Sequence, residues 1–420
     1  MSANGDFRTP AQHDTDRIQY SSALRRLDGV TQVVAVGERM LLHNRLTHTI
    51  KVAQLSRRIS QYLLHSHSGL DLDPDAAEAA GLAHDLGHPP FGHIAEHALN
   101  DVMKPYTDGY EGNAQSFRIV TKLARSRHEA GLHLTDRTLN GILKYPWMHG
   151  TEGAPSKKKW GAYASEQPDF DRVRKGAAPF IKSLEAEVMD WADDISYAVH
   201  DLQDFYRAGI IPLELLRDRE DDREEFVGRV LGDLEEPLHP DVPHVSPDDA
   251  LSTLSNIFNL TQVTSTETGS MAHRDQVSRM GSKLINHFVK QTSVNAQGLF
   301  DVPAQGRLQV HILKQLTWQH VIQNPALATV QEGQVALIEE LFRTLYAWLE
   351  KEKKLQRLPT RLRELESFIR SDEPESAIEA QRARAVGDYL SSLTENQAVD
   401  LAARLKGTTF SSIQDSWLAT

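Results

Sequence analysis

The spacing of apolar residues is the feature that most constrains the fold of this 420-residue chain. Val52, Leu55, Ile59 and Tyr62 recur in alternating steps of three and four, which places them on one face of an α-helix. The alternation that a half-buried strand needs is scarce, and its best short candidate is residues 30–36. The sequence therefore predicts an all-α fold.

Helix boundaries can be predicted where capping residues stand. Asp73 followed by Pro74 matches an N-cap with proline in the first turn, and this helix is expected to stop at Gly87. The next helix is expected to begin at the prolines 89–90. Residues 180–206 predict a longer helix with an apolar stripe and a separate polar side.

The second half of the chain also has helical spacing. It follows a proline-rich, acidic stretch, residues 233–247, which is typical of a loop or linker. We therefore expect a helical core over residues 1–215 and a helical C-terminal region over residues 216–420 that packs onto it.

Composition restricts the kinds of function. The chain has no cysteine, which excludes disulfides, thiolate catalysis and cysteine-based zinc sites and fits a reducing cytoplasm. Its formal net charge of −12 argues against a broad nucleic-acid-binding surface, while a local basic pocket for phosphate is compatible with it. The N-terminus lacks an apolar signal segment, and no stretch approaches the roughly 18 apolar residues of a membrane span. We expect a cytoplasmic protein with no membrane contact.

Candidate metal ligands concentrate in one short string. Eight of the 19 histidines fall between positions 43 and 97, and the string HDLGHPPFGHIAEH holds four of them with two carboxylates. Neutral imidazoles and carboxylates together suit a divalent transition ion. The adjacent pair His84-Asp85 follows the small, apolar segment AAGLA, where a charged residue needs a partner.

Further ligands have to come from other helices. His48 lies at the start of an apolar stripe, and taken alone it is more often a hydrogen-bonded core histidine. Asp193 lies on the polar side of the 180–206 segment, and taken alone it is more often a surface carboxylate. The joint pattern of His48, His84-Asp85 and Asp193 favours a metal site.

This H…HD…D pattern matches the HD-domain superfamily, and the chain more narrowly resembles the bacterial dGTPase (deoxynucleoside triphosphate triphosphohydrolase) family. The strings that carry the resemblance extend from about residue 15 to about residue 398 in family order. The most specific are EGNAQSFR and WADDISYAVHD, and the others include SSALRRLDGVTQV, HNRLTHTIKVAQ, GLAHDLGHPPFGHIAEHAL, LNGILKYPW, KKKWGAYASE and VGDYLSSLT.

The resemblance implies roles for individual residues. The metal ligands would be His48, His84, Asp85 and Asp193, and the catalytic pair would be His93 and Glu96. His93 and Glu96 are three apart on one expected helix face, so the carboxylate can orient the imidazole. His88 and His97 are left as residues that support the metal ligands through hydrogen bonds.

The resemblance also implies substrate contacts. The deoxyribose would meet Gln32, Tyr197 and Asp201, with the Tyr197 ring leaving no room for a 2′-hydroxyl. The phosphates would meet Arg45, Lys144, Tyr145 and Lys159. The family often has a glutamine and a further basic residue where this chain has Asp28-Gly29, a departure at the edge of the expected nucleotide pocket.

The implied protein has an HD-domain catalytic core and a helical phosphohydrolase-associated C-terminal region. Its implied activity is hydrolysis of deoxynucleoside triphosphates (dNTPs), dGTP among them, to the deoxynucleoside and inorganic triphosphate. The resemblance implies one divalent metal per site, with Mn and Mg as the leading candidates and Fe, Co, Ni and Zn as alternatives. The resemblance further implies a homo-oligomer and a nucleotide or single-stranded nucleic-acid effector. Two alternatives stay open: another HD phosphohydrolase, such as a nucleotidase or phosphodiesterase, and a nucleotide-binding regulatory protein.

Overall fold

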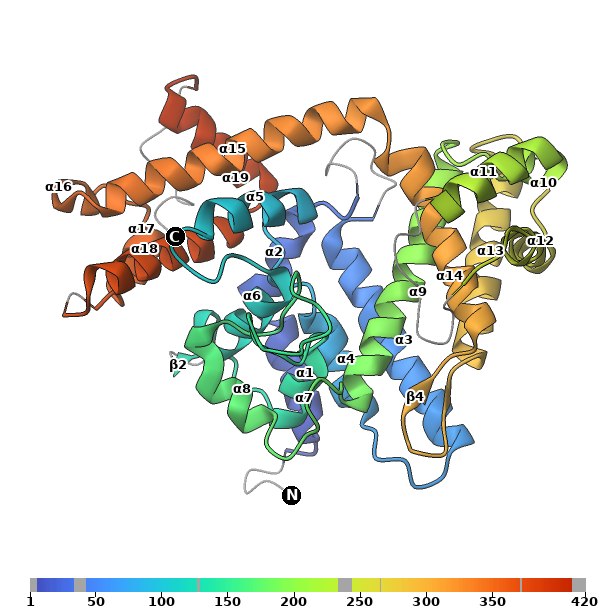
Figure 1. The fold of residues 1–420 in the computed structure, drawn as a ribbon, viewed down its shortest axis with the longest axis horizontal. Helices are drawn as coiled ribbons and strands as arrows, with labels where there is room; N and C mark the ends of the chain where they lie inside the picture. Colours follow the sequence, from blue (N-terminus) through green and yellow to red (C-terminus); the bar gives the residue numbers. More distant parts are fainter. Residues whose placement is uncertain are drawn as a thin grey trace.

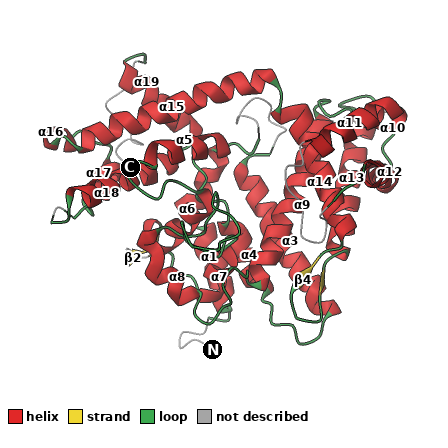
Figure 2. Cartoon of the chain, viewed as in Figure 1, coloured by secondary structure: helices red, strands yellow, loops and turns green. Residues whose placement is uncertain are grey.

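The computed structural model describes residues 6–33, 43–126, 129–232, 244–264, 266–370 and 372–409. Helices dominate these residues, so the predicted all-α class is confirmed (Figure 2). The strands within the described ranges form two short antiparallel hairpins, β1 (Arg125–Ser126) with β2 (Glu129–Ala130) and β3 (Ser293–Val294) with β4 (Phe300–Asp301). No described helix is both long enough and apolar enough to cross a bilayer.

The first half of the chain holds helices α1 to α9. Their bounds are α1 (Pro10–Gln19), α2 (Ser22–Arg26), α3 (Arg45–Ser66), α4 (Pro74–Ala83), α5 (His93–Met103), α6 (Gly112–Arg118), α7 (Asp136–Ile142), α8 (Gln167–Val173) and α9 (Leu184–Arg207). Short 3₁₀ turns follow α2 and precede α8, at η1 (Leu27–Gly29) and η3 (Ala164–Glu166), and one π-helical turn follows α6, at η2 (Ile119–Leu123).

The second half holds helices α10 to α19. Their bounds are α10 (Leu213–Asp218), α11 (Glu220–Gly232), α12 (Pro247–Thr261), α13 (Met271–Lys290), α14 (Ala304–Thr317), α15 (Pro325–Leu349), α16 (Glu352–Leu355), α17 (Thr360–Glu366), α18 (Glu375–Ser391) and α19 (Glu395–Lys406). A second π-helical turn, η4 (Trp318–Ile322), follows α14.

Local capping explains where the central helices begin. The Asn44 side chain accepts a hydrogen bond from the backbone N–H of Thr47 and starts α3. The Asp73 side chain does the same for α4, as predicted, with Pro74 in the first turn. Ser183 caps α9, which therefore begins four residues later than position 180. Of the predicted apolar face of α3, Val52, Leu55 and Ile59 are buried and Tyr62 is partly buried.

Two predicted helix boundaries are wrong. Helix α4 ends at Ala83 rather than Gly87, because Gly87 passes beneath α6, where an added Cβ would lie 2.1 Å from the Gly112 carbonyl oxygen. Helix α5 begins at His93 rather than at residues 89–90, because Phe91 and Gly92 have φ values of 67° and 61°, which a right-handed helix does not allow. Of the strand candidate at residues 30–36, Thr31 forms an isolated antiparallel bridge with Asn44, and residues 34–36 lie outside the described residues.

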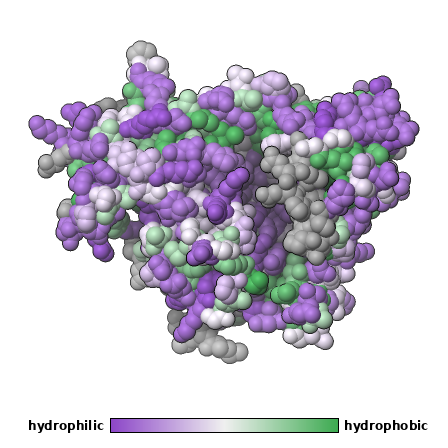
Figure 3. Space-filling model, in the orientation of Figure 1, coloured by the Kyte–Doolittle hydropathy of each residue, from purple (hydrophilic) through white to green (hydrophobic). Residues whose placement is uncertain are grey.

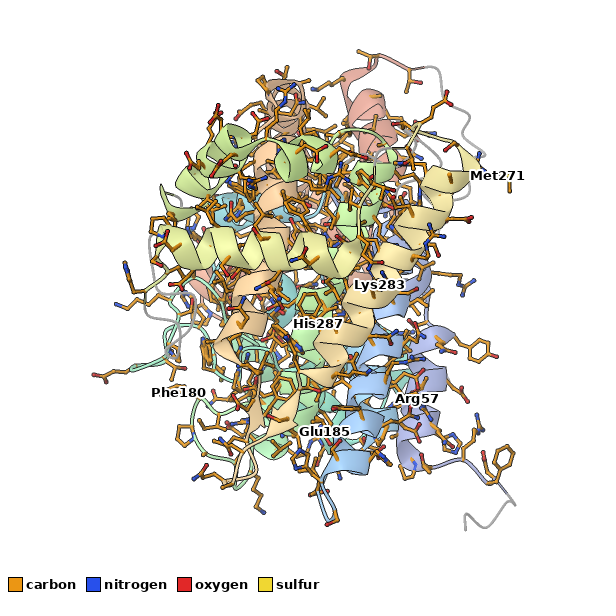
Figure 4. All side chains as sticks on the ribbon, turned by 90° about the vertical axis from the view of Figure 1, so that its right-hand side faces the viewer. Arg57, Phe180, Glu185, Met271, Lys283 and His287 are labelled. Carbon is orange, nitrogen blue, oxygen red and sulfur yellow. The ribbon has the colours of Figure 1, made fainter. Side chains whose placement is uncertain are left out.

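The first helical body packs around α3, α4 and α9, which lie side by side in the middle of the molecule (Figure 1). The apolar stripe of α9 also packs against α13 and α14, and the rings of Trp191 and Phe288 meet edge to face at 6.5 Å. Figure 4 shows α13 from the side, with Met271 at its exposed start and His287 near its end. One core therefore joins the HD-like helices to the second half of the chain.

A second core joins α5 to the C-terminal helices α15, α18 and α19. Helix α15 runs along the top of the molecule in Figure 1 and reaches α5. The visible face is mostly hydrophilic and has a hydrophilic hollow near its centre (Figure 3). The C-terminal region thus packs onto the first half, as predicted, whereas a boundary at residue 215 stays a prediction.

Candidate metal centre and active site

Three side chains from three helical segments converge at the centre of the first helical body. His48 comes from the first turn of α3, His84 caps the end of α4, and Asp193 comes from α9. His48 Nε2 lies 3.0 Å and His84 Nε2 lies 3.7 Å from Asp193 Oδ1. One ligand atom from each residue lies within 4.8 Å of the others, which is close enough to surround one ion.

The donor set fits a divalent metal. His84 donates its Nδ1–H to the Gly81 carbonyl oxygen at 2.7 Å, which turns Nε2 toward the other two donors. That Nε2 is buried and has no hydrogen-bond partner, a state that a metal ion would relieve. Burial opposes ionisation of Asp193, but Lys144, a hydrogen bond from His48 and the nearby His84 imidazole hold its pKa well below the usual range.

Asp85 lies beside this three-donor cluster rather than in it. Its Oδ2 accepts a 2.7 Å hydrogen bond from Arg45 Nη1, while its Oδ1 lies 3.4 Å from His84 Nε2 and 3.2 Å from His88 Nδ1. Burial opposes ionisation, yet His84 and Arg45 hold the pKa of Asp85 well below its usual range. An ionised carboxylate thus stands next to the cluster, and its role as a ligand stays a prediction.

The predicted catalytic pair forms a second cluster. His93 Nδ1 lies 3.0 Å from Glu96 Oε2, and His88 Nε2 lies 3.8 Å from the same oxygen. The Glu96 carboxylate is buried, but the His93 hydrogen bond, His88 and Lys159 hold its pKa well below its usual range. The ionised carboxylate fixes the Nδ1–H of His93, whose side chain is 64% exposed, so Nε2 stays free to exchange a proton.

Lys159 contacts this second cluster directly. Its Nζ lies 2.7 Å from Glu96 Oε1 and 3.1 Å from Glu111 Oε1. Glu111 also caps α6 by accepting hydrogen bonds from the N–H groups of Asn113 and Ala114. Glu111 was not among the predicted site residues, although its place in the EGNAQSFR string, as an acidic residue before a helix, was a signal for it.

Lys144 contacts Asp193, one of the three donors of the metal centre. Its Nζ is 2.9 Å from Asp193 Oδ2 and 2.8 Å from Asp190 Oδ1. Asp190 was not among the predicted site residues, although it lies one turn before Asp193 on the same helix. Tyr145 follows Lys144 and packs edge to face on Trp147 at 5.5 Å.

The predicted sugar contacts Tyr197 and Asp201 follow Asp193 at successive turns of α9, as predicted. Asp201 is buried, and its Oδ2 has no hydrogen-bond partner within the part of the chain that the structure describes. Burial, followed by the neighbouring Asp204, raises the pKa of Asp201 well above its usual range. Lys314 Nζ lies 5.7 Å from the ring centroid of Tyr197. The side-chain oxygen of Gln32 is buried and makes no hydrogen bond within the described residues.

Residues from the far end of the chain hold the loops of the site. Glu395, the first residue of α19, accepts hydrogen bonds from the backbone N–H groups of Thr31 at 2.6 Å and Phe91 at 3.2 Å. Arg45 Nε in turn donates to the Thr31 carbonyl oxygen at 3.2 Å. The local sequence around Glu395 could not predict its role at the site, because Glu395 is separated from Phe91 and Thr31 by 304 and 364 positions in the sequence.

The two histidines left without a primary role differ. His88 is buried and belongs with His93 and Glu96 to the second cluster, and it also lies near Asp85, whereas His97 is exposed on α5 and belongs to neither cluster among the described residues. The Asp28-Gly29 departure has a structural use. The Asp28 carboxylate accepts a 2.7 Å hydrogen bond from the Asn44 side chain, and a Cβ on Gly29 would lie 2.8 Å from Thr394.

Comparison with known proteins identifies two regions of the chain. Family models for the HD domain and for the phosphohydrolase-associated domain match residues 45–198 and 300–404. The first model contains the residues of both clusters, and the second contains Glu395. A solved phosphohydrolase from Bacteroides thetaiotaomicron aligns over 96% of this chain and 70% of its own at 12% identity, with a TM-score of 0.32, too low to compare the helix arrangements.

Curated relatives match over nearly the whole chain. A deoxyguanosinetriphosphate triphosphohydrolase-like protein of Streptomyces coelicolor is 34% identical, with 95% of this chain and 93% of the relative covered. A protein of the same description from Corynebacterium diphtheriae is 31% identical, with 94% and 91% covered. The chain therefore belongs to the deoxyguanosinetriphosphate triphosphohydrolase-like family of HD-domain phosphohydrolases.

Proposed function

We propose that this HD phosphohydrolase cleaves dNTPs, dGTP among them, to the deoxynucleoside and inorganic triphosphate. The proposal rests on two neighbouring clusters that Asp85 and His88 connect. One holds the donors His48, His84 and Asp193, and the other holds the hydrogen-bonded pair His93 and Glu96. The first can hold an ion, and the second can transfer a proton.

His48, His84 and Asp193 would hold one divalent ion, with Asp85 as a fourth ligand. When bound, such an ion supplies Lewis-acid polarisation of a phosphoryl oxygen and a more acidic water. Mn and Mg are the first expectations, and the two imidazoles also suit Fe, Co, Ni or Zn. Arg45 and Lys144 would add positive charge against a substrate that carries about four negative charges.

His93 would exchange the proton at Nε2, because its Nδ1–H is fixed by Glu96. The proton would go to the 5′-oxygen of the departing nucleoside or come from the attacking water. Such general acid–base catalysis contributes roughly 100- to 10,000-fold to the rate. Lys159, held by Glu96 and Glu111, would stand beside the phosphates as a second cation.

Tyr197 and Asp201 would select the sugar, with Gln32 as a third contact. A tyrosine ring against C2′ leaves no room for a 2′-hydroxyl, which would exclude ribonucleotides. The raised pKa of Asp201 means that its carboxyl can hold a proton, so it can donate as well as accept a hydrogen bond at the 3′-hydroxyl.

Product analysis tests the proposal. Metal-free enzyme is incubated with each dNTP and NTP, with Mn or Mg added, and the products are identified by chromatography and phosphorus NMR. Deoxynucleoside with intact triphosphate is the expected result. Release of orthophosphate or pyrophosphate would overturn it in favour of another HD phosphohydrolase. Binding without turnover under every metal would overturn it in favour of a nucleotide-binding regulatory protein. A homo-oligomer and a nucleotide or single-stranded nucleic-acid effector belong to this proposal as its regulatory part.

A further inference from the structure

A cavity of about 740 Å³ lies between the two halves of the chain, away from the proposed active site. One wall comes from α6, η2, the β1–β2 hairpin and residues 163–165, and the other from α17 and α18. No member of the His48 or His93 clusters lines it. Its volume is in the range that encloses a small organic molecule.

Arg384 of α18 has an unused hydrogen-bond donor in this wall. The residue is only 8% exposed, and its guanidinium carbon stacks 3.6 Å from the ring centroid of Tyr163. Its Nη2 donates to Asp108 and to the Gly109 carbonyl oxygen, whereas its Nη1 is buried and has no hydrogen-bond partner among the described residues. A buried donor without an acceptor is unfavourable, so an acceptor oxygen placed here would be stabilised.

The charged side chains around the cavity limit how many negative charges a bound ligand can carry. Five cations line it, and most already have partners: Arg118 binds Asp388 and Glu166, Arg361 binds Glu364, and Arg384 binds Asp108. Lys122 shares Glu166 with Arg118. Counted with their four carboxylate partners, of which Asp108, Glu364 and Asp388 also line the cavity, the five cations leave a surplus of one positive charge among these described side chains. A polyphosphate would bring several more negative charges than this wall can neutralise.

The rest of the wall is largely apolar. Leu123, Leu365, Phe368, Ile369 and Ala380 contribute side chains to it, and Phe368 is 68% exposed. Apolar walls with a few convergent polar groups are typical of sites for organic ligands. A carboxylate suits a guanidinium N–H, since a charged acceptor makes a stronger hydrogen bond than a neutral one.

We propose that this cavity is a second ligand site, which binds a small organic monocarboxylate with an apolar body. The carboxylate accepts from Arg384 Nη1, and the apolar body packs against Leu365 and Phe368 of the same wall and against Leu123 of the opposite wall. The site stands apart from the proposed catalytic function, since none of its lining residues belongs to the metal or proton-transfer clusters.

Isothermal titration of the full chain with 1-naphthoate and with octanoate tests the proposal, with neutral 1-naphthalenemethanol as the matched ligand. We expect saturable binding of one carboxylate per chain, and binding of the neutral analogue weaker by about tenfold or more. Absence of saturable carboxylate binding, or equal affinity for the alcohol, would overturn the proposal. Tighter binding of inorganic triphosphate that R384M weakens would also overturn it, because the site would then be for polyanions.

Three variants locate the binding. Arg384→Met should weaken carboxylate binding about tenfold or more, because it removes the charged donor. Ala380→Phe should do the same by filling the cavity while leaving every charge in place. Arg382→Met is the matched control, since Arg382 lies on the same helix, pairs with Glu375 and does not line the cavity. Unchanged binding in both A380F and R384M would place the ligand elsewhere and refute the assignment.

Discussion

His84 and His93 belong to one short string of sequence, yet their surroundings assign them opposite tasks. His84 is buried, and its free Nε2 faces Asp193; His93 is mostly exposed, and its Nδ1 is held by Glu96. We expect His84→Ala to lose the metal and all hydrolysis, because a ligand is deleted. His93→Ala should keep the metal and lose roughly 100- to 10,000-fold in kcat. Elemental analysis with steady-state kinetics checks both.

The assignment fails in two recognisable ways. Metal content near that of wild type in His84→Ala would remove His84 from the ligand set. Loss of metal in His93→Ala would place His93 in it. Asp85→Ala decides the open question about Asp85: a fourth ligand predicts metal loss as in His84→Ala, and a purely ion-paired carboxylate predicts that the metal remains.

Tyr197 and Asp201 predict separable effects on sugar selection. Tyr197→Ala should narrow the preference for dGTP over GTP, because it removes the ring that meets a 2′-hydroxyl. Asp201→Ala should instead lower kcat/KM for dGTP by roughly tenfold or more and leave the 3′-deoxy analogue unaffected. The measurement is kcat/KM on the three substrates with the three proteins. Equal rates of wild type on dGTP and GTP would rule out sugar selection at this site.

The buried carboxyl of Asp201 also predicts a dependence of stability on pH. Burial and Asp204 raise its pKa in the folded state, so the folded chain keeps a proton that the unfolded chain releases near pH 4. Stability therefore falls as the pH rises from about 4 through the folded pKa. The Asp201→Asn variant has no titrating carboxyl at this position, so its stability does not fall in this way as the pH rises. Its Tm should exceed that of wild type by on the order of 1–3 °C at pH 8 and match it at pH 4.

Thermal unfolding across that pH range checks the expectation. Asp101→Asn is the control, because Asp101 is an exposed residue of α5 with only a surface ion pair to Lys104. A constant difference between Asp201→Asn and wild type at every pH would show that the carboxyl keeps its ordinary pKa.

At the scale of the element, α19 positions two loops of the active site through Glu395. Glu395→Ala should lower kcat/KM and reduce stability by about 1–3 kcal/mol, because the buried N–H groups of Thr31 and Phe91 lose their acceptor. Glu395→Gln keeps an acceptor oxygen and should restore most of the activity. Gln397→Ala controls for damage to α19 itself, since it removes that helix's capping-box partner without touching either loop. Equal kcat/KM in Glu395→Ala and Gln397→Ala would contradict the positioning role.

The sequence predicted which segments are helical more accurately than where each helix begins and ends. Periodicity identified α3 and α9, and hence the shared face of Asp193, Tyr197 and Asp201, since local spacing alone decides which residues share a helix face. The ends of α4 and α5 depend on contacts across the fold, at Gly87 beneath α6 and at the left-handed pair Phe91-Gly92.

In the candidate site, too, local sequence patterns predicted the clustered residues but not the contacts between distant parts of the chain. Its histidines and carboxylates stood out as a dense local string or through family resemblance. Asp190 and Glu111 carried weaker signals, and Glu395 carried none that spacing could provide. Lys144 was expected at the phosphates, and its ion pairs with Asp190 and Asp193 could not be anticipated, because they join residues far apart in sequence.

At the scale of the whole molecule, both halves of the chain contribute to both large cores. Helix α5 buries Ala95, Leu99 and Met103 against α15 and α18, and α9 packs against α13 and α14. A chain of residues 1–215 would expose these faces to water, and each large apolar side chain so exposed would lose about 1.5–3 kcal/mol. We therefore expect residues 1–215 alone to show no cooperative unfolding and no metal binding.

Co-expression with residues 216–420 should restore both properties, because the missing faces are then supplied by a second chain. A chain that ends at residue 409 is the control, since it retains every described helix and should unfold like the full protein. Calorimetry and elemental analysis on the three preparations provide the comparison. Cooperative unfolding of residues 1–215 with bound metal would show instead that the first half is an independent domain and that the C-terminal helices only cover it. Glu395 would then be dispensable for building the metal site and needed only for the loops around it.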